Sequence, residues 1–150
     1  MAPDEGAALK LRAEDAEDLA VISACLQDAL VAVRDLAYVP EERSFLFVAN
    51  RFRWENGLRP RPGEVPYERV LCGITFSEVA GASYSGFRRS NDGRILSLLA
   101  IRAEDPAVHL EFSDGAAIRL EVARILCHAQ DLGDPWPTPW QPRHDVDGVS

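Results

Sequence analysis

The chain has 150 residues, the usual length of one domain, and its 47% hydrophobic and 27% charged residues are typical of a globular protein. This composition excludes a disordered or collagen-like chain, and no apolar run approaches the roughly 18 residues that a membrane helix needs. A net charge of −8 opposes binding to nucleic acid, which depends on Lys and Arg to neutralise phosphates. We therefore expect a single domain over residues 1–150, with neither a nucleic-acid nor a membrane partner.

The N-terminal sequence and the cysteines indicate the compartment. The start, MAPDEGAALK, lacks the basic residues and the apolar stretch of a secretory signal. Cys25, Cys72 and Cys127 are odd in number and widely spaced, so they indicate neither a disulfide framework nor a structural zinc site. We expect a cytoplasmic protein with reduced cysteines in its core, and with no metal and no cofactor.

The first predicted elements are a short strand and a helix. Leu9 and Leu11 alternate with basic residues, which suits an extended segment after a frayed start at residues 1–8. Asp15 is a good N-cap, and the apolar spacing after it indicates an amphipathic helix that ends near residues 27–28.

Residues 30–54 predict a β-hairpin. Apolar and aromatic side chains recur at every second position on both sides of a turn at residues 40–43, and this register places Tyr38 opposite Phe45. Both faces are largely apolar, so at least part of the hairpin should be covered on both sides.

A loop rich in proline and glycine follows at residues 55–66. It is not a domain boundary, because neither side has enough apolar residues for a separate core. Further strands are expected at residues 67–77, more weakly around 82–87, and at 95–102.

The clearest local prediction is a second hairpin. Apolar residues alternate in 108–112 and in 118–122, and a three-residue loop ending at Gly115 sets the two apolar faces against each other. Gly115 then takes the left-handed position of a type I turn with a G1 bulge. This register pairs His109 with Arg119.

The C-terminal part is predicted to be a helix and an extended tail. From Ala123 the apolar spacing becomes helical, and Gly133 is a natural C-cap. The prolines of residues 134–150 predict a polyproline-like path. Trp136 and Trp140 are too apolar to stay in solvent, so we expect them to pack on the sheet or on a neighbouring subunit.

His128 and Asp131 are one candidate site. They are three residues apart and share a face of the predicted helix, next to Cys127. A histidine and a carboxylate at this spacing can bind a metal or exchange protons, but a metal site generally needs three or four ligands, and the sequence offers no third one. Surface or capping roles are the simpler interpretation.

The other histidines are weaker candidates. His109 and Glu111 lie on the polar face of their predicted strand with Arg119 across from them, as on an ordinary solvated strand. The same groups, with Arg119 or Arg102, would line any ligand site in the mouth of a curled sheet. His144 lies in the tail.

Arg51, Arg53 and Trp54 form a candidate recognition patch, because arginine and tryptophan are favoured in interfaces. The alternative is that Trp54 closes the edge of the core while the arginines extend past it. The sequence contains no P-loop, dinucleotide-binding, nucleophile-elbow, zinc-protease or EF-hand motif, so we predict no catalytic residues.

Five stretches carry a family resemblance: LQDA around residue 27, DLAYVPEERSF, NRFRWE, DGAAIRLEV and DLGDPW. With these stretches in this order along nearly its whole length, the chain resembles a family of small alphaproteobacterial proteins catalogued as domain of unknown function 2948. The resemblance implies a compact bacterial cytoplasmic protein, and it brings no catalytic residues with it.

Together these patterns predict an α+β fold, with a curled antiparallel sheet of about six or seven strands and one helix at each end of the chain. Its layout resembles a roll or split barrel, such as a pleckstrin-homology-like fold. The expected function is a non-catalytic interaction or self-association module that uses the tail tryptophans and residues 51–54. The alternative is a small-ligand-binding protein or an enzyme with a His and carboxylate site in the mouth of the sheet.

Overall fold

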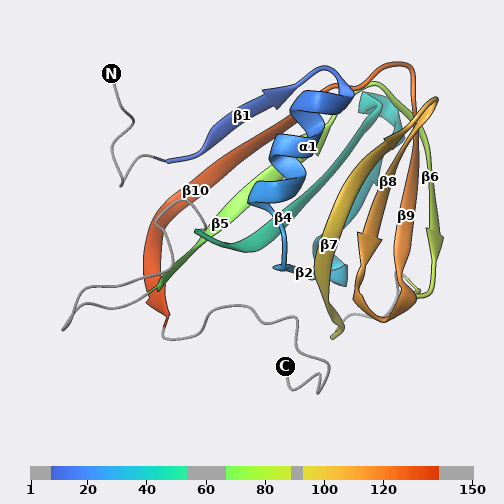
Figure 1. Cartoon of the computed structure of the whole chain (residues 1–150). Coiled ribbons are helices and arrows are strands. Elements are labelled where there is room, and N and C mark those ends of the chain that lie inside the picture. The colour runs from blue at the N-terminus through green and yellow to red at the C-terminus, as the bar shows by residue number, and fades with distance from the viewer. Residues whose placement is uncertain (1–7, 54–66, 89–92, 139–150) are drawn as a thin grey trace.

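The computed structural model describes residues 8–53, 67–88 and 93–138. Within these residues, ten strands form one antiparallel sheet that is accompanied by one α-helix, α1 (Ala16–Cys25) (Figure 1). The strands are β1 (Lys10–Ala13), β2 (Ala29–Ala32), β3 (Ala37–Val39), β4 (Ser44–Phe52), β5 (Tyr67–Phe76), β6 (Val79–Ser85), β7 (Ile95–Glu104), β8 (Ala107–Phe112), β9 (Ala117–Val122) and β10 (Cys127–Thr138).

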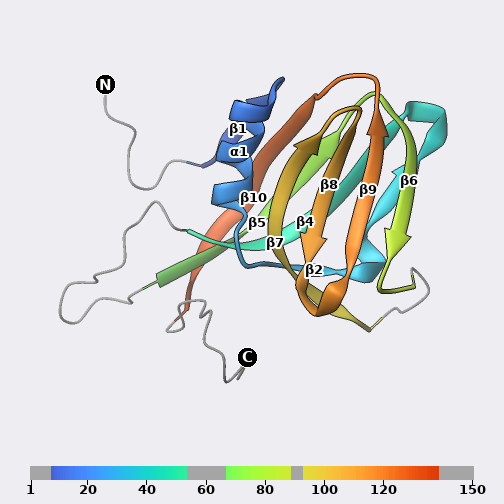
Figure 2. The same ribbon diagram turned by 45° about the vertical axis from the view of Figure 1, so that its right-hand side comes forward.

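The sheet curls strongly but does not close. Its spatial order is β1-β10-β5-β4-β2-β7-β8-β9-β6, with β3 also paired to β4, so β1 and β6 are the two edges. The start of β6 lies against the turn between β3 and β4, where the Val79 amide donates to the Arg43 carbonyl at 2.8 Å. Figure 2 shows the strands wrapping around a common interior.

One cluster of buried apolar side chains fills the inside of the curl. Its largest members are phenylalanines: Phe45 and Phe47 on β4, Phe76 on β5 and Phe112 on β8. α1 adds Leu19 and Ile22 to the same cluster and contacts β1 and β7. The helix therefore covers the concave side of the sheet, and among the described residues no helix lies over the outer side of β10, β5, β4 and β2 (Figure 1).

The N-terminal helix begins where the sequence predicts. The Asp15 Oδ1 atom accepts from the Asp18 amide at 2.8 Å, which satisfies a backbone donor of the first turn. α1 ends at Cys25, slightly before the predicted end. It is fixed to β7 by a bond from the Ile101 amide to the Ser23 Oγ atom at 2.9 Å.

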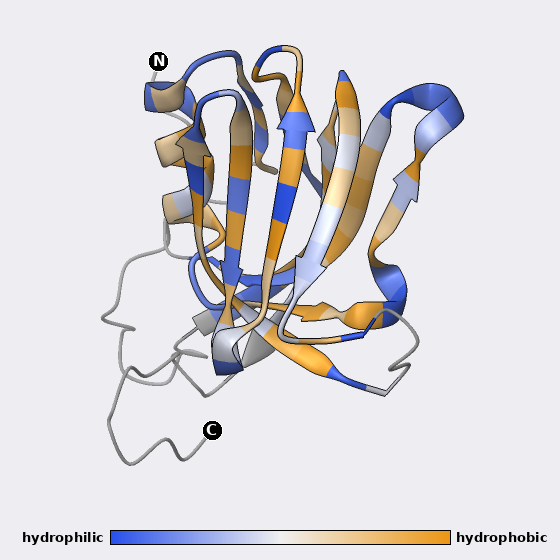
Figure 3. Ribbon diagram, turned by 90° about the vertical axis from the view of Figure 1, so that its right-hand side faces the viewer, coloured by the Kyte–Doolittle hydropathy of each residue, from blue (hydrophilic) through white to orange (hydrophobic). Residues whose placement is uncertain are grey.

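The second predicted hairpin is confirmed in its register. His109 pairs with Arg119 and Leu110 pairs with Ile118 across β8 and β9. Gly115 has the predicted positive φ, 75°, but Asp114 also has a positive φ, 60°, so the predicted type I turn is wrong, because that turn requires a negative φ at both central residues. Figure 3 shows hydrophilic and hydrophobic residues alternating along these strands, as expected for a sheet with one face on a core.

The first predicted hairpin is confirmed at its turn and interrupted further away. Tyr38 pairs with Phe45 as predicted. However, a short 3₁₀ turn at Val33–Asp35 divides the expected first strand into β2 and β3. β2 pairs with β7 on one side and with β4 on the other, and it thereby joins the two halves of the sheet.

The three strands predicted between the hairpins are β5, β6 and β7. Gly73 in β5 permits a close approach, because a Cβ atom at this position would lie 3.3 Å from the Leu132 Cδ1 atom. The weak strand expected around residues 82–87 is β6, which begins at Val79.

The predicted C-terminal helix is wrong, because residues 127–138 form the longest strand, β10, instead. β10 pairs with β5 on one side and β1 on the other. Cys127, Ala129 and Asp131 alternate inward, and this period-two pattern overrides the helical spacing seen in the sequence. Gly133, with a φ of 72°, lies in a β-bulge between Leu132 and Trp136 rather than at a helix end.

The predicted strand count of six or seven is also too low. The additional strands are short or come from the expected helix: β1, β3 and β10. The pleckstrin-homology-like layout depended on a closing C-terminal helix, and that segment is a strand within the sheet. Of the predicted tail, residues 134–138 belong to β10, and the rest lies outside the described residues.

Candidate functional site

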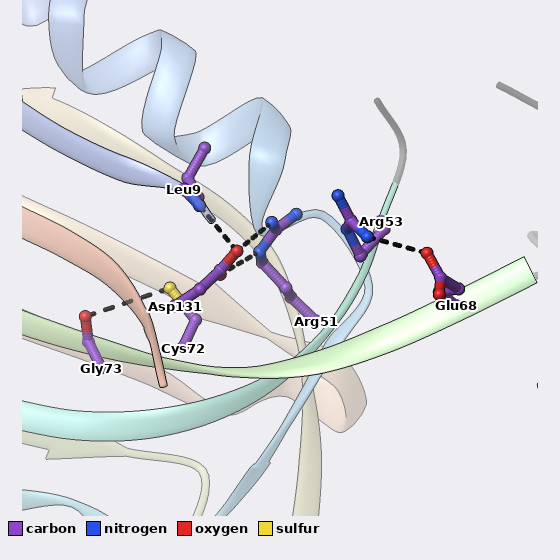
Figure 4. Close-up of polar contacts among 7 residues, drawn as sticks. All are labelled: Leu9, Arg51, Arg53, Glu68, Cys72, Gly73 and Asp131. Atoms are coloured by element: carbon purple, nitrogen blue, oxygen red, sulfur yellow. Dashed lines mark hydrogen bonds and ion pairs between the residues drawn. The ribbon is translucent and has the colours of Figure 1, made fainter. Parts of the chain in front are cut away.

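Arg51 on β4 and Asp131 on β10 form a buried ion pair inside the sheet (Figure 4). The Arg51 Nε atom donates to Asp131 Oδ1 at 2.7 Å, and Nη2 donates to Oδ2 at 2.7 Å. The two side chains are 0% and 3% exposed. Paired charge-assisted bonds of this geometry fix both partners in position.

Strand register explains why these two side chains meet. β5 lies between β4 and β10, where Arg51 pairs with Val70 and Asp131 pairs with Cys72. Val70 and Cys72 both face the core, so their paired residues face it too. The Arg51 guanidinium therefore reaches across β5 to the carboxylate.

Asp131 also holds the segment that leads into β1. The Leu9 amide donates to Asp131 Oδ2 at 2.8 Å, and the Asp131 amide donates to the Leu9 carbonyl at 2.9 Å. One carboxylate thus connects β10 both to β4 and to the N-terminal edge of the sheet.

The environment keeps this carboxylate ionised. Burial alone would raise the pKa of Asp131, but the hydrogen bonds from Arg51 and Leu9 and the charges of Arg51 and Arg53 outweigh burial, and the pKa is lowered. Enclosed, ionised and hydrogen-bonded, the pair has a structural role that joins strands.

The Cys72 thiol, beside the ion pair, is unreactive at neutral pH. Burial, together with the negative charge of Asp131, raises the pKa of Cys72 to about 12. Burial raises the pKa of Cys127 to about 12 as well. Because the thiolate is the nucleophilic form, neither cysteine is an activated nucleophile at neutral pH.

The predicted recognition patch is only partly within the described residues. Arg51 is fully buried, and Arg53 is nearly so, with its Nη1 atom 2.7 Å from the Glu68 Oε1 atom. The Arg53 amide also donates to the Glu68 carbonyl at 2.9 Å. Both arginines thus pair with carboxylates of their own chain, and neither is exposed at its surface. Trp54 lies outside the described residues.

His128 and Asp131 do not share a face. Residues that are three positions apart on a strand point to opposite faces. Asp131 therefore faces the core, while His128 is exposed on the outer side. His128 pairs with Arg12 on β1 and with Thr75 on β5. The proposed grouping depended on the helix that the structure replaces with β10.

His109 lies between two arginines on the outer side of β7, β8 and β9. It pairs with Arg102 on one strand and with Arg119 on the other. Arg119 also binds Glu121, with its Nε atom 2.9 Å from Oε1, and lies 3.8 Å from Glu104. These are partly exposed surface ion pairs, of which Arg119–Glu121 lies within β9 and Arg119–Glu104 joins β9 to β7.

The described residues contain neither a cluster of metal ligands nor a membrane-spanning helix. Among the described residues, no three His, Cys, Asp or Glu side chains gather closely enough to hold a metal ion. In that same part of the chain, no helix combines the length and apolar character that crossing a membrane requires. His144 and Trp140 lie outside it.

The outer apolar face is formed by exposed side chains on four strands: Leu30 on β2, Leu46 on β4, Leu71 on β5, and Leu132 and Trp136 on β10. Register places three of them in one row, because Leu132 pairs with Leu71, Leu71 with Asn50, and Asn50 with Leu30. Trp136 pairs with Arg69, which faces the same side as Leu71 two residues away.

Of this face, only Trp136 was a sequence-predicted site residue. The four leucines were not predicted as site residues. Each alternates with buried neighbours, as any outward-facing residue of a strand does. They become a surface only once β10, β5, β4 and β2 are known to be adjacent, and that order depends on long-range pairing. The sequence signal was the apolar character of both faces of residues 30–54.

The fold and site together define a small module built on an open, curled antiparallel sheet with an internal ion pair. The chain belongs to the family described as "Protein of unknown function (DUF2948)", whose pattern matches residues 9–144. The family membership that the resemblance implied is thereby confirmed. No curated protein and no solved structure matches the chain.

Proposed function

We propose that this protein is a non-catalytic interaction module that contacts another protein chain through the outer apolar face. The observation that carries the proposal is the row of Leu132, Leu71 and Leu30, in register across β10, β5, β4 and β2. Leu71 and Leu132 remain 41% and 44% exposed. Exposed apolar patches that extend over several strands are characteristic of contact surfaces.

Trp136 supports the same surface. It is 37% exposed and lies next to the row, further along β10 than Leu132, where it pairs with Arg69. Tryptophan and arginine are enriched among the residues that contribute most to protein interfaces. The proposal thus keeps this tail tryptophan and replaces Arg51 and Arg53, which are buried, with Arg69 and the leucines.

The chemistry of the interior favours contact over catalysis. The ionised carboxylate of Asp131 is bonded to Arg51 and Leu9, and the neighbouring Cys72 thiol is protonated at neutral pH. A His and carboxylate site receives less support, because His128 and Asp131 face opposite sides of β10.

The proposal includes a bacterial cytoplasmic location. Cys25, Cys72 and Cys127 are not joined by disulfides in the structure, and Cys72 and Cys127 are buried. Free thiols are usual in the reducing cytoplasm, whereas exported proteins of this size commonly form disulfides.

Site-specific photo-crosslinking in the native cell tests the interaction. A benzophenone amino acid at Leu71 should give a covalent adduct with a protein, because the side chain lies within the proposed contact surface. The same group at Val21, which is 54% exposed on α1, is the matched control and should give none. Equal labelling at both positions, or none at Leu71, would contradict the proposal.

A further inference from the structure

The partner can be specified further, and this step rests on the proposed function. We infer that the outer apolar face binds a second copy of the same chain, in a two-fold dimer with the two sheets packed face to face. Sheets pack in this way about 10 Å apart, with their strands within about 30° of each other. The row of leucines supplies the contact.

The row is self-complementary under a two-fold axis. Consider an axis parallel to the strands, midway between the two sheets and over the gap between β5 and β4. It brings Leu132 of one copy opposite Leu30 of the other, and Leu71 opposite Asn50, because these four residues occupy successive strands in one register. An isologous contact needs this reciprocity.

The oxygen atoms of Asn50, the polar residue in the row, are hydrogen-bonded within the chain. The Arg69 Nη1 atom donates to the Asn50 carbonyl at 3.1 Å and to its Oδ1 atom at 3.3 Å. The Arg69 guanidinium carbon also lies 5.9 Å from the centre of the Phe52 ring. The Asn50 acceptors are thus satisfied within one chain, so a partner need not supply donors to them.

The charge distribution also favours this face over others for self-contact. Two copies with a net charge of −8 repel each other over most of their surfaces. Around the leucine row, the outward positions that pair across β10, β5 and β4 carry no carboxylate: His128, Gln130, Arg69, Gly73, Thr75 and Val48. The nearby carboxylates are Asp134, which is exposed in the adjoining bulge, and Asp28, which directly precedes β2 and whose charge acts on Arg69.

The face from β10 to β2 has the area of a small dimer contact. These four strands have 12, 10, 9 and 4 residues, and at about 3.3 Å per residue and 4.8 Å between strands they cover roughly 550 Å². A specific interface buries at least about 1,000 Å² summed over both partners. Because the sheet curls away from this outer side, we place the contact on these four strands and not on β7.

Analytical ultracentrifugation of the full chain over a concentration series tests the inference. The wild type should sediment at twice the 16.6 kDa chain mass, and Leu71→Lys should raise the dimer dissociation constant at least about tenfold, because it places two ammonium groups near the axis. Val21→Lys changes the net charge equally and should dimerise as the wild type does. Leu132→Lys is a second interface variant. Each of the two lysine variants is interpreted only if its circular dichroism spectrum shows a native fold.

The outcomes separate the two proposals. A monomeric wild type, or a dimer that neither lysine variant weakens, would overturn the second-copy inference. If the wild type is monomeric while the Leu71 photo-adduct contains a different protein, the proposed function stands and the inference fails. If Leu71 gives no adduct and the wild type is monomeric, both fail.

Discussion

Arg51 and Asp131 are 80 positions apart in the sequence and meet at 2.7 Å inside the sheet. Because β5 lies between their strands, the ion pair fixes the relative positions of β4, β5 and β10. The Leu9 amide adds the N-terminal segment to the same carboxylate. The outer apolar face lies on the reverse side of these strands, so the ion pair also holds that face in shape.

Removal of one partner of the pair should be costly. Asp131→Asn leaves the Arg51 guanidinium buried without a counter-charge, and we expect it to lower the free energy of unfolding by about 3–5 kcal/mol. Urea unfolding followed by circular dichroism measures the change. As a control, Glu104→Gln breaks two exposed ion pairs, with Arg102 and Arg119, whose side chains are 53% and 43% exposed, and it should change stability by less than about 1 kcal/mol.

The double variant Arg51→Met/Asp131→Leu distinguishes the loss of the ion-pair attraction from the cost of leaving one charged side chain buried without its partner. Since it removes both charges and retains apolar volume, it should recover much of the stability lost in Asp131→Asn. A single-variant loss below about 1 kcal/mol would show that the pair contributes little.

The stability contributed by Asp131 should disappear in acid. Its pKa is lowered in the folded protein, so its carboxylate contributes stability above the unfolded-state pKa of about 3.9, and this is lost as the pH falls through the folded value. The difference in unfolding free energy between wild type and Asp131→Asn should therefore be constant near neutrality and shrink below about pH 4. A difference that grows on acidification would contradict the assignment.

The three thiols should react at very different rates. Burial raises the pKa of both Cys72 and Cys127 to about 12, whereas Cys25 is only partly buried on α1. A thiol reagent at pH 8 should label Cys25 first and the other two only after unfolding. Mass spectrometry of labelled peptides identifies the sites, and Cys25→Ser should abolish the early reaction. Early labelling of Cys72 would show that the interior is open.

Two glycines near the β8–β9 turn should differ in their tolerance of a methyl group. Gly86 and Gly115 have φ values of 79° and 75°, so alanine is strained at both. A Cβ atom at Gly86 would also collide with the backbone of residues 115–116, whereas one at Gly115 has open space. Thermal unfolding should show Gly86→Ala less stable than Gly115→Ala by about 1–3 kcal/mol. Equal losses would mean that the loops separate easily.

Local signals in the sequence predicted the parts of the fold that local chemistry determines. The Asp15 cap depends on one side chain and a nearby amide, and the β8–β9 register depends on two apolar faces and one glycine. The interruption at Val33–Asp35 was missed because it serves β2, which must pair with β4 and with β7 at once. No pattern within residues 30–54 encodes that distant neighbour.

The same limit explains the error in the C-terminal segment. Asp131 occupies an inward strand position, and a carboxylate there conceals the apolar alternation of Cys127 and Ala129. Its compensating partner, Arg51, is too far away in the sequence to be recognised. Both residues were candidates for function, but only the strand order shows that they belong together, inside the protein.

The central claim, that the outer apolar face contacts another copy of the chain, is tested most directly by methyl NMR. As the protein concentration rises, the methyl resonances of Leu30, Leu71 and Leu132 should shift or broaden together, while those of Val21 on the exposed side of α1 should stay constant. Leucine resonances that are independent of concentration, or equal shifts at Val21, would contradict the claim.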